Sequence, residues 1–225
     1  MVILNHQLGH FLSLAILVGL LYFCTIIDNS VLDGEFLGIS TGYWSLITLL
    51  VAVVHQVYVL LCWRYELNYN SLSNRYGQKA FEIFKIGFAL LFVSRLISLT
   101  LLAISNSGTL NINTALKYIL TTLLMILWLL LAYSFRRYFG IDRAMGLDHF
   151  EPRKYRGKGL VNQGIFKYTS NGMYFFGPLI LWVIALLLES KAALLLAGFS
   201  HLYIWVHYFF TELPDMKEIY GISPK

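Results

Sequence analysis

Long apolar runs separated by short polar segments dominate this chain. Six of them approach the roughly 20 apolar residues that a membrane-spanning helix needs. The fifth run is short, at roughly 15 residues, so we expect a tilted or partly re-entrant arm that forms a hairpin with the sixth. The predicted spans are residues 10–27, 42–63, 84–104, 114–135, 174–188 and 192–210.

This pattern predicts an all-α integral membrane protein with about six transmembrane helices, the last two forming a helical hairpin. Residues 1–135 supply an N-terminal four-helix membrane part. Residues 136–225 supply a cytosolic interfacial segment and then the C-terminal hairpin, and we expect both parts to form one compact bundle. In residues 136–169 apolar side chains alternate with charges, which is typical of an interfacial helix in the headgroup layer, and Pro152 then breaks it.

Composition excludes a soluble domain. Hydrophobic residues make up 58% of the chain, charged residues only 13%, and the mean hydropathy is +0.65. Soluble domains carry about 25% charged residues. The formal charge of +5 does not indicate nucleic acid as a partner, because the positive residues lie in the loops between apolar runs.

The distribution of basic residues predicts the topology. Lysine and arginine concentrate in residues 64–85, in residues 136–167 and near the C-terminus. Arg95, Lys117 and Lys191 are the exceptions. Under the positive-inside rule both termini and these loops are cytosolic.

Two short motifs mark the last third of the chain. The first reads Gly164-Ile165-Phe166-Lys167-Tyr168 and continues, after two residues, as Asn171-Gly172-Met173-Tyr174. The second reads Glu212-Leu213-Pro214 and is followed by Glu218-Ile219-Tyr220.

Together these motifs resemble those of the intramembrane S-adenosylmethionine-dependent methyltransferases. That superfamily joins the phospholipid (phosphatidylethanolamine) N-methyltransferases with the isoprenylcysteine carboxyl methyltransferases. The resemblance covers residues 138–221, with departures: Ser170-Asn171 replaces an Arg-His pair, Gly172 a proline and Leu213 a second glutamate, and no Gly-x-Gly precedes the motif. The resemblance implies S-adenosyl-L-methionine as cofactor, a lipid or lipid-like small-molecule acceptor, and a site facing the cytosol within the bilayer.

The residue types in the motifs suit that cofactor. Glu212 can bind its ammonium or ribose hydroxyls, while Asn171 and free backbone amides can bind its carboxylate. Aromatic faces suit the adenine or the sulfonium. The predicted cofactor-binding residues are Gly164, Tyr168, Asn171, Met173, Tyr174, Trp205 and Glu212.

An amine acceptor must also lose a proton, which makes Glu212 or His207 a candidate base; Glu212, Tyr174 and His207 are the predicted catalytic residues. Structural explanations compete: Glu212 as an interfacial charge, Asn171 as a helix N-cap, and Tyr174 as an aromatic-belt residue. We expect no metal site, because His201 and His207 are not on one helical face and no third ligand accompanies them.

Arg95 lies near the middle of the third predicted span, where a charge is costly and often functional. His55 is a plausible polar neighbour, so Arg95 and His55 are the predicted substrate-binding residues, for a lipid phosphate or an acidic group. Arg95 paired with helix carbonyls is the structural alternative.

The leading functional hypothesis is therefore a membrane-embedded methyltransferase for a lipid amine of the phosphatidylethanolamine type, favoured by the Asn-x-Met-Tyr form of the first motif. Three alternatives remain open: an isoprenylcysteine-type carboxyl O-methyltransferase, an NADPH-dependent sterol-type reductase, and a non-enzymatic lipid-binding or transport bundle.

Overall fold

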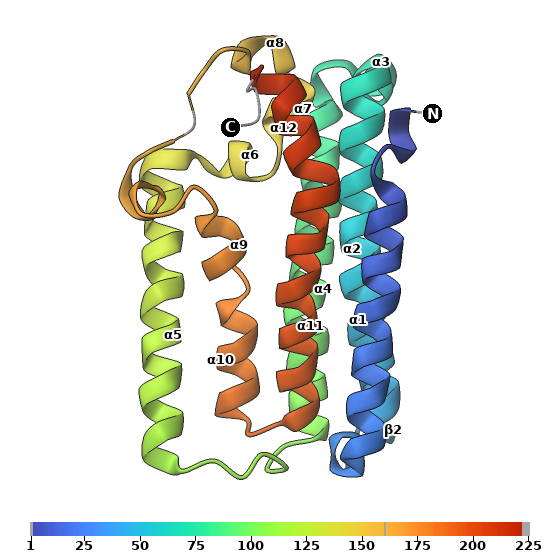
Figure 1. Cartoon of the computed structure of the whole chain (residues 1–225), viewed down its shortest axis with the longest axis vertical. Coiled ribbons are helices and arrows are strands. Elements are labelled where there is room, and N and C mark those ends of the chain that lie inside the picture. The colour runs from blue at the N-terminus through green and yellow to red at the C-terminus, as the bar shows by residue number, and fades with distance from the viewer. Residues whose placement is uncertain (1, 160, 222–225) are drawn as a thin grey trace.

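The chain forms a bundle of long, roughly parallel helices, seen in a computed structural model that describes residues 2–159 and 161–221 (Figure 1). Within these residues five helical segments are long and apolar enough to cross a membrane, which confirms the predicted all-α integral membrane fold. The segments are α1 (Gln7–Ile27), α2 (Thr41–Tyr69), α3 (Ser71–Tyr76) with α4 (Ala80–Ser105), α5 (Thr114–Ser134) with the π-helical turn η4 (Phe135–Phe139), and α11 (Lys191–His207) with the π-helical turn η6 (Tyr208–Glu212) and α12 (Leu213–Tyr220).

The predicted fifth span is broken into two short helices. These are α9 (Gly172–Phe176) and α10 (Leu179–Leu187), which follow one another between α5 and α11 (Figure 1). The break falls at Pro178, which has no backbone N–H to donate to the preceding turn. The short fifth arm expected over residues 174–188 is therefore present, with a break inside it.

The last helical segment is longer than predicted. Helical structure passes through η6 and α12 to Tyr220 instead of ending near residue 210. Pro214 does not stop it, because it lies in the first turn of α12, where its missing N–H costs no hydrogen bond. Glu212 consequently lies inside a long helical segment and not at its end.

The segment between α5 and α9 folds over one end of the bundle as a series of short turns. It comprises η4, α6 (Ile141–Ala144), α7 (Leu147–Phe150), α8 (Pro152–Tyr155) and the 3-10 turn η5 (Gly164–Lys167). The predicted single interfacial helix is therefore not observed, and Pro152 begins a helix instead of breaking one. These turns form the roof over the end of the bundle where α12 finishes (Figure 1).

Ion pairs tie the opposite end of the bundle together. Here a short hairpin of β1 (Glu35–Phe36) and β2 (Ile39–Ser40) precedes α2. The Lys191 ammonium lies 2.7 Å from an Asp28 carboxylate oxygen, and Lys117 pairs with Glu189. Two of the three basic residues that depart from the positive-inside pattern are therefore held by local carboxylates.

The hydrophobic core lies where α2, α4, α10 and α11 meet. Small side chains let these helices approach closely, as is common in membrane bundles. The fully buried alanines of this core are Ala103, Ala185, Ala192, Ala193 and Ala197. Both the N-terminal and the C-terminal part of the chain contribute to this one core.

Candidate active site

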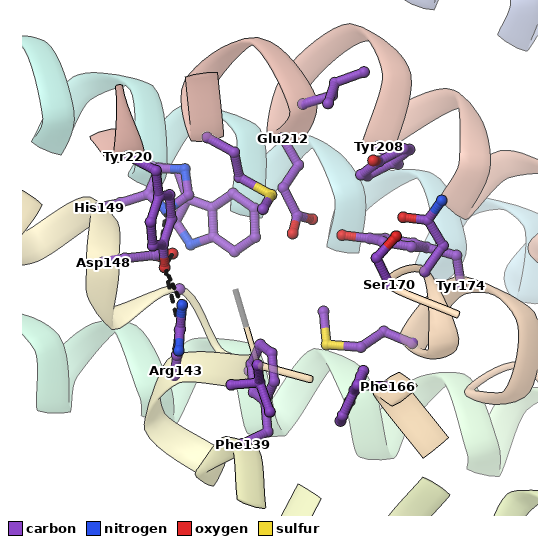
Figure 2. Close-up of a pocket in the computed structure, with 18 of the residues that line it drawn as sticks. Phe139, Arg143, Asp148, His149, Phe166, Ser170, Tyr174, Tyr208, Glu212 and Tyr220 are labelled. Carbon is purple, nitrogen blue, oxygen red and sulfur yellow. Dashed lines mark hydrogen bonds and ion pairs between the residues drawn. The ribbon is translucent and has the colours of Figure 1, made fainter. Parts of the chain in front are cut away.

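A cavity of about 480 Å³ lies beneath the roof of short turns. The two sequence motifs meet here: Asn171, Met173 and Tyr174 line it from the start of α9, and Glu212 lines it from η6. Figure 2 shows the Tyr174 hydroxyl pointing toward the Glu212 carboxylate. The structure thus brings together the two segments that the sequence analysis linked.

The π-helical turn η6 orients Glu212, and two other helices hold this turn in place. A π turn disturbs the regular hydrogen-bond ladder of a helix. The Gln7 side chain of α1 donates to the Phe210 carbonyl at 2.8 Å. The Arg64 guanidinium of α2 donates to the Phe210 and Thr211 carbonyls at 3.3 and 3.4 Å. The residues just before Glu212 are therefore anchored from outside the cavity.

The start of α9 presents a free amide to the cavity. Asn171 occupies the N-cap position, but its side chain makes no capping hydrogen bond. Gly172 packs against η5 so closely that a Cβ there would lie 3.2 Å from the Ile165 Cγ2 atom. Asn171 thus stands at the N-cap position without capping the helix through its side chain, and its carboxamide lines the cavity.

Tyr174 carries a buried hydroxyl that interacts electrostatically with the Glu212 carboxylate. Its side chain is 4% exposed, and the hydroxyl makes no hydrogen bond of ordinary geometry with the residues that the structure describes. Its ring packs on Tyr208 and Trp205, with centroids 4.4 and 5.4 Å away. A buried polar group that lacks such a hydrogen bond costs about 1–3 kcal/mol. A hydroxyl left in this state beside a cavity is typical of a group that pairs with a ligand.

The opposite wall of the cavity is built from residues that the motif search did not identify as a site. Arg143 Nε and Nη2 donate to the Tyr220 hydroxyl oxygen at 3.1 and 3.0 Å. The Tyr220 hydroxyl in turn donates to Asp148 at 2.8 Å, and Asp148 pairs with His149 at 3.0 Å (Figure 2). In the sequence, only the position of Ile219-Tyr220 just after the second motif pointed to this wall. Arg143, Asp148 and His149 did not stand out, because charged residues are frequent throughout residues 136–169.

His149 carries a positive charge at neutral pH within this wall. Burial alone would lower its pKa, but the Asp148 and Asp215 carboxylates raise the pKa to about 9. For the Asp148 carboxyl, burial acts in the opposite direction and raises the pKa. The hydrogen bonds from His149 and Tyr220 outweigh burial and hold this pKa below its usual value. The His149 ring stacks on Trp63 at 4.2 Å.

Four other predicted residues lie outside the lining of this cavity. Gly164 has a φ of +59° in the turn before α9, and Tyr168 is 85% exposed. Trp205 supports the ring of Tyr174 from behind. His207 is 3% exposed and packs 5.7 Å from Trp63, which itself lines the cavity. Of the two predicted bases, Glu212 therefore has the direct access to the cavity.

The predicted substrate-binding residues lie deeper in the bundle. Arg95 lines a separate cavity between α4, α5 and α10. His55 is buried on α2, with its ring edge against Phe88 at 4.8 Å. Neither lines the cavity that holds Glu212.

The family comparison agrees with the geometry. Residues 116–223 match the model of the phospholipid methyltransferase family. The searches of curated proteins and of solved structures gave no match. The family match spans α5, the roof, the broken span and the last helical segment, which together supply most of the cavity wall. The match agrees with the resemblance expected from the motifs and supports a membrane-embedded methyltransferase.

Proposed function

We propose that this protein transfers a methyl group from S-adenosyl-L-methionine to the amine headgroup of a phosphatidylethanolamine-type lipid. One observation carries the proposal: the half-buried Glu212 carboxylate and the buried Tyr174 phenol point toward each other in one cavity, beside the Asn171 amide, in the region that matches the family model. The roof above the cavity carries most of the basic loop residues, so we place this end and both termini in the cytosol.

The residues of the cavity fit this cofactor. The volume of about 480 Å³ lies within the range of about 300–1,000 Å³ typical of small-molecule sites. Glu212 would bind the cationic ammonium, and the Asn171 amide would bind the carboxylate. Lys217, which also lines the cavity, adds a positive charge for that carboxylate. The cofactor, when bound, supplies a methyl group made electrophilic by its sulfonium.

Glu212 also favours an amine as the acceptor. An ammonium headgroup must lose a proton before its nitrogen can attack, and a carboxylate that lines the cavity can accept that proton. The cavity also carries the positive side chains of Arg143, His149 and Lys217, so the preference for an amine rests on the proton-accepting role of Glu212 and not on the net charge of the cavity. The methyltransferase match leaves the reductase and transport hypotheses without support.

Binding of S-adenosylhomocysteine to the purified protein, measured by calorimetry, tests the cofactor. We expect Glu212→Gln to weaken binding about tenfold or more, because a hydrogen bond to a charged group contributes about 1.5–3 kcal/mol. Glu218→Gln is the matched control, because Glu218 lies on the exposed face of the same segment. Wild-type affinity in the Glu212→Gln variant would remove the basis of the proposal.

The acceptor is tested with radiolabelled S-adenosylmethionine and two kinds of vesicle. One contains phosphatidylethanolamine and the other a prenylated cysteine. We expect label to enter only the amine lipid. Label in the prenylated cysteine alone would show that the acceptor assignment is wrong while the cofactor assignment holds.

A further inference from the structure

A second cavity lies deeper in the bundle and differs in character from the first. It has a volume of about 230 Å³ and is enclosed by α4, α5, the start of α10 and one residue of α11. Arg95 is the only charged side chain among the described residues that line it. The other lining residues are apolar or aromatic, among them Phe92, Trp128, Leu131 and Leu181.

No carboxylate of residues 2–159 or 161–221 pairs with the guanidinium of Arg95. It makes no hydrogen bond or ion pair with any residue in the part of the chain that the structure describes. On its other side it borders a small space lined by Thr48 and Ser200, which offers two hydroxyls but no carboxylate. An unpaired charge within a membrane bundle is costly, so such a residue marks a ligand or ion site by default.

The break in the fifth span adds a second feature that favours an anion. Gly177 and Pro178 line the cavity, and α10 begins immediately after them. The first N–H groups of a helix have no acceptor within the helix and carry partial positive charge. The Arg95 guanidinium and the start of α10 thus border the same apolar space, and both are suited to a negative group.

The depth of this cavity separates it from the headgroup of the methyl acceptor. Ser200 and Ile204 border Arg95 across the two spaces, and they precede Glu212 by twelve and eight residues. At a helical rise of 1.5 Å per residue, this corresponds to roughly 12–18 Å. In phosphatidylethanolamine only two carbons join the amine to the phosphate. Arg95 therefore does not reach the phosphate of a lipid whose amine lies at Glu212.

A carboxylate suits the site better than a phosphate. A carboxyl group has an ordinary pKa near 4–5, and a low-dielectric environment raises this pKa, so its neutral form can move through hydrocarbon. A phosphate stays charged and would meet the full cost of burial. The volume of about 230 Å³ is also below the usual range for whole ligands and suits one chain end.

The cavity is accessible from the lipid. Phe92, on its rim, is 44% exposed on the surface of α4. Helix α5 packs much more extensively against α10 than against α4, and the cavity lies between α4 and α5. We propose that this cavity binds the carboxyl end of a single-chain fatty acid, paired with Arg95 and the start of α10, as a site separate from the methyl-transfer cavity.

Binding of tritiated oleate to the full-length protein in phosphatidylcholine nanodiscs tests the proposal. We expect oleate to bind, Arg95→Gln to weaken it about tenfold or more, and Arg95→Lys to retain most of the affinity. Arg75→Gln, at an exposed position on α3, is the control. Oleyl alcohol, which has the same chain without the charge, should compete poorly.

Several results would overturn the proposal. These are equal binding of oleate by Arg95→Gln, equal competition by oleyl alcohol, or stronger competition by lysophosphatidate, which would assign a phosphate instead. A second variant, Ala132→Phe, fills the cavity from α5 and leaves the guanidinium in place, so wild-type binding of oleate by this variant would also be contradictory. Binding of S-adenosylhomocysteine to Arg95→Gln and of oleate to Glu212→Gln should both persist, so the two proposals fail separately.

Discussion

Arg64 holds the π turn that orients Glu212, and its removal gives the sharpest structural prediction. The side chain is buried, and its Nε lies 2.9 Å from a carboxylate oxygen of Asp215. The same guanidinium donates to the Asn5 carbonyl at 2.9 Å and to the carbonyls of Phe210 and Thr211. Arg64→Met would keep much of the volume and remove all of these bonds together.

The expected cost follows from the groups left behind. Removal of one partner of a buried ion pair typically costs about 3–5 kcal/mol. Two features reduce it here: His149 Nε2 lies 3.6 Å from Asp215, and Gln7 still donates to the Phe210 carbonyl. We therefore expect a loss of about 3 kcal/mol, which in a chain of this size lowers the unfolding temperature by roughly 6–12 °C.

Thermal unfolding of the detergent-solubilised protein, followed by tryptophan fluorescence, measures this loss. Arg75→Met, on the exposed part of α3, is the control and should change the temperature by less than about 2 °C. The double variant Arg64→Met/Asp215→Leu should recover part of the stability, because it removes the stranded carboxylate. A shift no larger than that of the control, or strictly additive losses in the double variant, would refute this account of η6.

Three further predictions concern the cavity and its walls. Tyr174→Phe removes a buried hydroxyl that faces Glu212 but makes no hydrogen bond of ordinary geometry in the described residues, so the unfolding temperature should change little, while affinity for S-adenosylhomocysteine falls; a large drop in unfolding temperature would contradict this. Gly164→Ala should destabilise by about 1–3 kcal/mol, since φ is +59° and a Cβ would lie 2.6 Å from Ser134 Oγ, and an unchanged unfolding temperature would argue against that strain. The pKa of His149 is raised from 6.5 to about 9, so its protonated form stabilises the fold fully below pH 6.5, and this stabilisation should be lost as the pH rises through 9. Unfolding temperatures measured from pH 6 to 10 should show the loss. The Asp148→Asn variant should show a smaller loss over the same range.

The chemistry of single residues set the class of this protein and the approximate place of its helices. The free energy of transferring a helix from water into the bilayer depends mainly on that helix's own residues, so membrane spans can be predicted without knowledge of the neighbouring helices. The motif around Asn171 and Tyr174 and the carboxylate of Glu212 were likewise visible, because they lie in short contiguous segments. The break at Pro178 was also encoded locally, although the apolar run concealed it.

Only the tertiary structure decided which polar residues share a cavity. Arg143, Asp148 and His149 reach it because the roof folds back over the bundle, a contact between segments with no common sequence pattern. Glu212 points inward because Gln7 and Arg64, far away in the chain, stabilise a π turn that local propensity does not specify. His207 and Glu212 are close in sequence, yet only Glu212 lines the cavity, because the packing of neighbouring helices determines which face of a helix borders it.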